Sequence, residues 1–136
     1  MFSHMTIGAS DLSRAIAFYD VVLAPLGIKR LPVNYATWAS WQRPGEAPKL
    51  WVGLPFNKTP AHPGNGWMAA FSASGRKAVD EAYAAAISAG AEDEGAPGLR
   101  PNFGPNYYGA YVRDLDGNKI HFVCREEEAT DVASSN

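Results

Sequence analysis

The sequence predicts a single α+β domain in which one order of elements, a strand, a helix and then further strands, occurs twice. Apolar residues fall at helical spacing in two segments, and a strand-like run precedes each of them. Landmarks of the first helix return in the second, since Tyr19 and Tyr83 are 64 residues apart and Gly27 and Gly90 are 63 apart. A chain of 136 residues with 46% apolar residues can bury such a unit around one core.

The first half begins with a strand-like run at residues 2–10. Asp11 follows as a good helix N-cap, and an apolar face at helical spacing extends from residue 12 to 26. Gly27 is placed to end that helix. Three short strand-like runs separated by turn residues come next, at 28–35, 37–42 and 50–54.

The second half repeats this order after a loop rich in proline and glycine. A strand-like run leads into a second helical face, which Gly90 ends. Six Gly and Pro residues between Gly95 and Pro105 predict a long loop. Asp116-Gly117 is a strong signal for a hairpin. The predicted segments are the loop at 57–66, the strand at 67–72, the helical face at 78–87, the hairpin strands at 107–113 and 119–125, and a flexible acidic and polar tail at 126–136.

Composition excludes several classes of function. A net charge of −2 with only 19% charged residues argues against a nucleic-acid partner. No apolar run approaches the ~20 residues of a membrane span. The N-terminus lacks a signal peptide, and the single cysteine, Cys124, rules out an internal disulfide framework, so we expect a cytoplasmic protein. Cys124 is expected to be a buried, inert thiol.

Two stretches carry a family resemblance, HMTIGASDLSRAIAFYDVVLAPLGIKRL at 4–31 and NFGPNYYGAYVRDLDGNKIHFVCR at 102–125. They resemble the vicinal oxygen chelate superfamily, the group of glyoxalases, bleomycin resistance proteins and extradiol dioxygenases. The resemblance implies one domain over 1–125 with two βαβββ modules, about 1–56 and 66–125. Their sheets would form an open, U-shaped mixed β-barrel with flanking helices, completed within the chain or across a homodimer.

Metal-dependent members of this superfamily take ligands from the first and last strands of each module. The resemblance places these positions at His4, Trp51, Met68 and His121. Trp offers only an N–H donor and Met a soft thioether, so the set lacks the usual acids. We therefore expect no metal. A divalent Zn, Ni or Fe ion on His4 and His121, with His62 as a third ligand, stays open as the alternative.

The resemblance leaves two function classes, each with a small organic ligand. The first is a lyase or isomerase in which His4 and His121 act as acid and base, with or without a metal. The second is a metal-free protein that binds and sequesters its ligand, as in bleomycin resistance. An extradiol dioxygenase and the glutathione-linked glyoxalase reaction are disfavoured because the acidic ligands are missing. The expected ligand-binding residues are mainly aromatic, for a planar or apolar ligand: Trp38, Trp51, Met68, Tyr107 and Tyr108, with Asn106 and Arg100 as polar partners.

Overall fold

Both helices form where the sequence predicts them, with bounds that differ by at most three residues. The computed structural model describes residues 1–128. Helix α1, Leu12–Leu23, is capped by Asp11, whose Oδ1 accepts a hydrogen bond of 3.1 Å from the N–H of Arg14. The chain continues as the short 3-10 helix η1, Ala24–Leu26, and ends at Gly27 with a left-handed φ of 73°. Helix α2, Arg76–Ser88, is followed by Gly90, whose φ of 103° likewise favours glycine.

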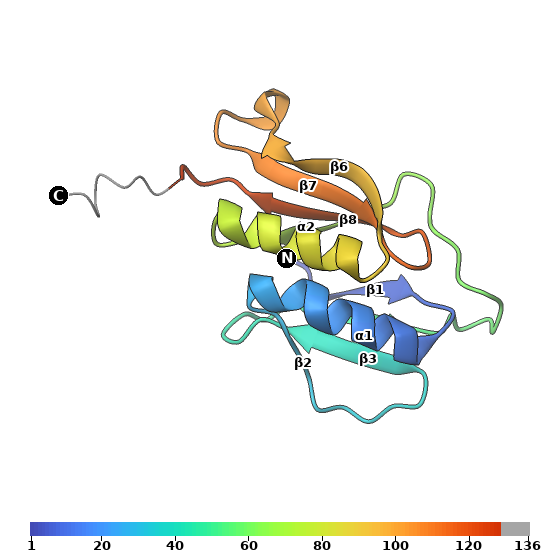
Figure 1. The fold of residues 1–136 in the computed structure, drawn as a ribbon. Helices are drawn as coiled ribbons and strands as arrows, with labels where there is room; N and C mark the ends of the chain where they lie inside the picture. Colours follow the sequence, from blue (N-terminus) through green and yellow to red (C-terminus); the bar gives the residue numbers. More distant parts are fainter. Residues whose placement is uncertain (129–136) are drawn as a thin grey trace.

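The strands form two sheets of four strands each (Figure 1). The first has the order β1-β4-β3-β2 and the second the order β5-β8-β7-β6. In each sheet the first pair is parallel and the other pairs are antiparallel. The strands are β1 (His4–Gly8), β2 (Lys29–Arg30), β3 (Trp38–Gln42), β4 (Lys49–Gly53), β5 (Ala69–Ser72), β6 (Glu92–Leu99), β7 (Tyr108–Arg113) and β8 (Lys119–Cys124). The predicted α+β fold of two βαβββ modules is confirmed, with sheets that are not closed into a barrel.

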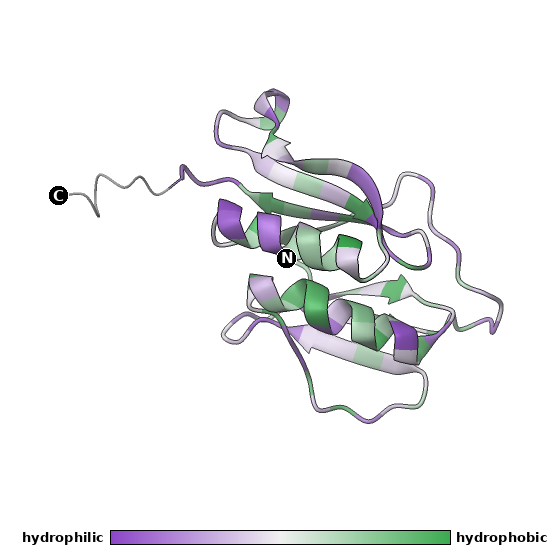
Figure 2. Ribbon diagram, in the orientation of Figure 1, coloured by the Kyte–Doolittle hydropathy of each residue, from purple (hydrophilic) through white to green (hydrophobic). Residues whose placement is uncertain are grey.

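Each sheet buries one face under its own helix and leaves the other face open. Helices α1 and α2 lie side by side between the two sheets in Figure 1 and pack against each other. Alternate residues of the strands, such as Ile7 and Val52 in the first sheet and Ile120 and Phe122 in the second, form the core with these helices. Figure 2 shows β8 as a largely hydrophobic strand. Within residues 1–128, no helix has the length and apolar character needed to cross a membrane.

The turn between β7 and β8 ties the second sheet to the first. The carboxylate of Asp114, which is only 7% exposed, accepts hydrogen bonds from the N–H groups of Asp116 and Asn118 at 3.0 and 2.8 Å. It also accepts from the hydroxyl of Tyr19 on α1. The side chain of Asn118 donates to Asp114 and to the carbonyl oxygen of Gly8, each at 3.0 Å. One buried carboxylate therefore orders the turn and connects it to α1.

Other atoms of the same turn reinforce this junction. The Oδ1 of Asp116 accepts from the N–H of Ser10 at 3.1 Å. The guanidinium of Arg14 donates to the carbonyl oxygen of Leu115 at 2.9 Å. Both contacts bring the turn against the segment that joins β1 to α1, so the hairpin fixes the second sheet against the start of the first module.

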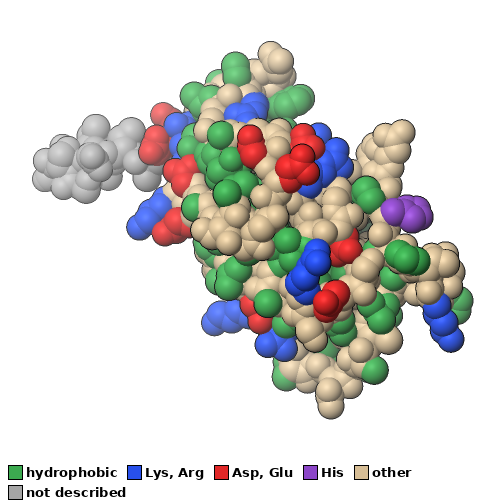
Figure 3. Space-filling model, turned by 45° about the vertical axis from the view of Figure 1, so that its right-hand side comes forward, with side chains coloured by type: hydrophobic (Ala, Val, Ile, Leu, Met, Phe, Trp, Pro, Cys, Tyr) green, Lys and Arg blue, Asp and Glu red, His purple; other side chains and the backbone are tan. Residues whose placement is uncertain are grey.

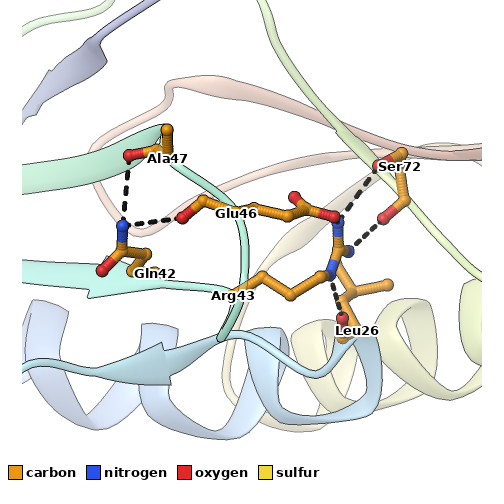
Figure 4. A network of polar contacts seen from close by, with 6 residues as sticks. All are labelled: Leu26, Gln42, Arg43, Glu46, Ala47 and Ser72. Atoms are coloured by element: carbon orange, nitrogen blue, oxygen red, sulfur yellow. Dashed lines mark hydrogen bonds and ion pairs between the residues drawn. The ribbon is translucent and has the colours of Figure 1, made fainter.

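A second polar junction lies after β3, at Arg43 (Figure 4). Its guanidinium donates to the carbonyl oxygen of Leu26 at 2.9 Å and to the hydroxyl and carbonyl oxygens of Ser72, at the end of β5. Glu46 forms an ion pair with the same guanidinium at 3.2 Å. Arg43 thus links the first sheet, η1 and the edge strand of the second sheet.

The prediction of a long loop after Gly90 is wrong over its first part. Residues Glu92–Leu99 form β6, an edge strand that pairs with β7 through register shifts at Gly95. An edge position and an irregular register accommodate Gly95, Pro97 and Gly98, which local patterns assign to a loop. The predicted strand at 28–35 is reduced to Lys29–Arg30. The predicted tail at 126–136 lies mostly outside the described residues.

We predict that Asp114→Asn lowers the free energy of unfolding by about 1–3 kcal/mol, because the amide cannot accept all the hydrogen bonds of the carboxylate. Urea unfolding at pH 7 measures this loss. The matched control is Asp80→Asn, since the exposed Asp80 accepts one hydrogen bond, from the Tyr108 hydroxyl. Its expected loss is under about 0.5 kcal/mol. Equal stabilities of the two variants would contradict the role of Asp114.

Candidate functional site

The open face of the first sheet carries an aromatic cavity of about 430 Å³. His4 and Thr6 alternate along β1, and Trp51 lies opposite Thr6 in the neighbouring strand. Tyr35, from the segment between β2 and β3, packs against Trp51 with ring centroids 6.0 Å apart. Trp38 completes the lining. Three aromatic rings therefore surround a space that contains few polar groups.

His4 is the one titratable imidazole that lines this cavity among the described residues. Its ring is exposed, and its Nδ1 lies 2.9 Å from the hydroxyl of Ser3. Its Nε2 has no hydrogen-bond partner within residues 1–128. This nitrogen is therefore open to a ligand or to solvent.

His121, on the open face of the second sheet, has the opposite environment. Its ring is fully buried and stacks on Tyr111, with centroids 3.9 Å apart and planes inclined by 9°. Nδ1 donates to the carbonyl oxygen of Ala110 at 2.8 Å, because a carbonyl can only accept. Nε2 is then the acceptor for the hydroxyl of Tyr107, also at 2.8 Å. Both ring nitrogens are thus occupied within the protein.

A glycine allows this packing. A Cβ at Gly109 would lie 2.5 Å from Cε1 of His121 and 3.1 Å from the carbonyl oxygen of Phe122. Only glycine lets the imidazole lie flat against β7 at this point. The sequence signal is a glycine between aromatic residues, at Tyr107 to Tyr111.

The electrostatic environment keeps His121 neutral. Burial is the main cause that lowers its pKa, and the positive charges of Arg100, Arg125 and Lys119 lower it further. The hydrogen bond to Ala110 acts in the opposite direction but does not reverse the shift. A neutral, fully hydrogen-bonded imidazole is suited to holding the sheet and its Tyr107 neighbour in place.

The four positions at which metal-dependent relatives carry their ligands do not suit a metal in this chain. Trp51 pairs with Thr6 in the first sheet, and His121 pairs with Ala70 in the second. Thr6 and Ala70 are 64 residues apart, which is the spacing of the repeat. Trp51 and His121 therefore occupy equivalent positions in the two sheets. Trp51 has no acceptor atom to offer, and both nitrogens of His121 are used. No group of three or more His, Cys, Asp or Glu side chains suited to a metal occurs in the described part of the chain.

Met68 belongs to a second cavity, of about 630 Å³. Its walls include Trp67, the loop at 63–66, and the side chains of Arg113 and Lys119. This lining is more polar than that of the first cavity. His62 lies elsewhere, in a small cavity of about 200 Å³ that contains neither His4 nor His121.

The remaining predicted residues are distributed over different surroundings. Tyr108 lies on the helix side of its sheet, where its hydroxyl donates to Asp80 of α2 at 2.6 Å, away from both cavities. Asn106 is half-buried beside Tyr107. The guanidinium of Arg100 lies over the ring of Tyr111, 5.6 Å from its centroid.

The structure therefore brings together two groups and not one. His4, Trp38 and Trp51 share the first cavity, while Tyr107, His121 and Arg100 gather on the second sheet. None of the cavities described here is lined by both His4 and His121. Tyr35 could not be predicted from the sequence pattern, because its position depends on the loop between β2 and β3. Lys119 and Arg125 are two further residues that were not among the predicted site residues, although their even spacing from His121 places them on the same face of the chain as that histidine.

We predict that the protein loses stability as the pH falls from 7.5 to 5.5. The unfolded chain binds a proton at His121 near its ordinary pKa of about 6.5, whereas the folded chain, with its lowered pKa, does not. Protons therefore favour the unfolded state across this window. Urea midpoints at several pH values measure the effect, and His121→Gln should show a flatter profile.

His4→Gln is the matched control, because it removes an exposed imidazole and leaves His121 intact. Its profile should follow that of the wild type. A wild-type midpoint that stays constant between pH 7.5 and 5.5, or a His121→Gln profile as steep as that of the wild type, would contradict this account of His121.

Comparisons with known proteins agree with this fold. A family model described as the Glyoxalase/Bleomycin resistance protein/Dioxygenase superfamily matches residues 1–122. A glyoxalase/bleomycin resistance protein from Albidiferax ferrireducens T118 is 37% identical, with a TM-score of 0.81 over 93% of this chain and 99% of that chain. No curated protein shows significant similarity.

More distant structures share the fold. A glyoxalase-related enzyme from Fulvimarina pelagi is 20% identical, with a TM-score of 0.70 over 91% of this chain and 87% of that one. A lactoylglutathione lyase from Agrobacterium tumefaciens is 22% identical, with a TM-score of 0.62 over 91% of this chain and 92% of that one. The match of the family model over nearly the whole chain and the 37% identity show that this chain belongs to the glyoxalase/bleomycin resistance protein/dioxygenase superfamily.

Proposed function

We propose that this protein binds a small, planar and largely apolar organic molecule without a metal, in the cavity on the open face of the first sheet. The cavity itself is the observation that carries this proposal. Its volume of about 430 Å³ suits a small organic ligand, and Tyr35, Trp38 and Trp51 offer three aromatic surfaces for stacking. His4 and Thr6 supply the polar contacts that would orient the ligand.

Two further observations favour binding over chemistry by a histidine pair. An acid and a base that act on one substrate must both reach it. His121 has both nitrogens engaged, with Ala110 and Tyr107, and it lines none of the cavities that His4 lines. The donor set also disfavours a metal, so a dioxygenase reaction, which depends on one, has no support from these residues.

A second candidate is a lyase or isomerase that uses His4 alone. This candidate is supported by the two ring nitrogens of His4. Nδ1 forms a hydrogen bond with the hydroxyl of Ser3, and Nε2 is free to contact a ligand. An imidazole with a free Nε2 can take a proton from a carbon next to a carbonyl group in the cavity.

Binding can be tested with 2-naphthol, a neutral planar probe, by calorimetric titration of protein that has been dialysed against EDTA. We predict binding without added metal. Trp51→Ala should weaken it at least about tenfold, because a stacking surface at the centre of the cavity is lost. Trp67→Ala is the matched control, since Trp67 lines the second cavity, and it should bind as the wild type does.

Two results would overturn the proposal of metal-free binding in the first cavity. One is a requirement for added Zn or Ni, and the other is an equal loss of affinity in the Trp51 and Trp67 variants. Far-UV circular dichroism of each variant establishes that it is folded before its affinity is compared.

The His4 candidate makes a separate prediction. Incubation in D₂O with a carbonyl compound that binds in the cavity should give deuterium exchange next to the carbonyl, as measured by NMR. His4→Gln should remove the exchange while the compound still binds. Exchange that persists in this variant would show that His4 is not the base.

A further inference from the structure

The open face of the second sheet gathers three positive charges around an aromatic stack. Lys119 and His121 alternate along β8, Arg125 directly follows the end of that strand, and Arg100 directly follows β6. The Nζ of Lys119 and the Cζ of Arg100 lie 5.3 and 5.6 Å from the centroid of Tyr111. The Cζ of Arg125 lies 5.0 Å from the centroid of Tyr107. Each of the three cations thus forms a cation–π contact with a tyrosine ring.

None of these three cations has a carboxylate within 4.0 Å among the described residues, where the ion pairs involve Arg30, Arg43, Arg76 and Arg113. His121 already covers one face of the Tyr111 ring at 3.9 Å. Lys119 and Arg100 both lie beside this ring. Their like charges are therefore close enough to repel each other. An anion placed between them would offset that repulsion.

The neighbouring cation shows what a structural role looks like. Arg113 pairs with Glu94 at 2.8 Å and donates to the carbonyl oxygen of Gly117 at 3.1 Å, so its charge is balanced and its position is fixed by the turn. On the face of the molecule drawn in Figure 3, acidic and basic side chains are likewise interspersed. Arg100 also donates to a backbone carbonyl oxygen, that of Ala96 at 2.8 Å, but within residues 1–128 neither it nor Lys119 nor Arg125 has an acidic partner.

A space for the body of a ligand lies beside these charges. Lys119 lines the cavity of about 630 Å³ together with Trp67 and Met68, which are 41% and 37% exposed. Trp67 and Met68 offer an apolar surface of the kind that planar ligands contact. The positive charges and the apolar surface therefore adjoin each other across Lys119.

We propose that the open face of the second sheet binds a small planar organic anion, an aromatic carboxylate, with Lys119 and Arg100 as the partners of its carboxylate. Arg125 adds to the positive potential at the other end of the stack, over Tyr107. The ring of the ligand contacts Trp67 and Met68. This site is independent of the first cavity, because it shares none of that cavity's lining residues.

The test uses two probes with the same ring system, 2-naphthoate and the neutral 2-naphthol, titrated calorimetrically at low salt. Wild-type protein should bind the naphthoate through an additional site that the naphthol does not occupy. Lys119→Gln combined with Arg100→Gln should weaken naphthoate binding at that site by roughly tenfold or more, since each charged contact is worth about a factor of ten. Binding of 2-naphthol should not change.

A charge-matched control removes two exposed cations from elsewhere, Lys29→Gln with Lys77→Gln. This variant should bind the naphthoate as the wild type does. Equal weakening in both double variants would show a general charge effect and overturn the site, as would unchanged naphthoate binding in the Lys119 and Arg100 variant. Trp51→Ala separates the two proposals, because it should weaken 2-naphthol binding at least about tenfold and leave the second naphthoate site intact.

Discussion

The rest of the structure depends on one buried carboxylate, that of Asp114. Burial raises its pKa, and the hydrogen bonds from Tyr19, Asn118 and the turn N–H groups act against that shift and stabilise the charge. Since these donors come from both halves of the chain, the carboxylate fixes the second hairpin against α1 and the end of β1. The second sheet is thereby fixed against α1, which packs in turn against α2, and each sheet keeps one face free of the helices.

The two open faces carry different side chains although their strands are equivalent. At the position of Trp51 the first sheet presents an aromatic side chain to a cavity, with the exposed His4 nearby. At the equivalent position the second sheet carries His121, whose two ring nitrogens form hydrogen bonds with Ala110 and Tyr107 of the same module. The neutral imidazole and its tyrosines then support a surface of unbalanced positive charge. The two equivalent sheets therefore differ in their open faces: that of the first is mainly aromatic, and that of the second is positively charged.

Much of the fold follows from local signals in the sequence. Asp11, Gly27 and Asp116-Gly117 act within a few residues, so the helix start, the helix end and the hairpin could be predicted. The equivalence of Trp51 and His121 followed from the lysine and apolar residue that precede each. Strand β6 could not be predicted, because its glycines and proline are compatible with a strand only through pairing with β7. The hydrogen bonds that occupy both ring nitrogens of His121 come from the Ala110 carbonyl oxygen and the Tyr107 hydroxyl, which lie in another strand and its flanking segment. The separation of His4 from His121 depends on how the two sheets are placed. Neither could be predicted from local sequence.

The central claim is that ligand binding takes place on the open face of the first sheet and leaves the helix side untouched. Fluorine NMR of protein labelled with 5-fluorotryptophan tests it most directly, because the four tryptophans lie in different surroundings. On addition of 2-naphthol, the account predicts shifts of the Trp38 and Trp51 resonances, with Trp41, buried against α1 through its hydrogen bond to Asp20, and Trp67 unchanged. Shifts at Trp41 or Trp67 with none at Trp51 would contradict it.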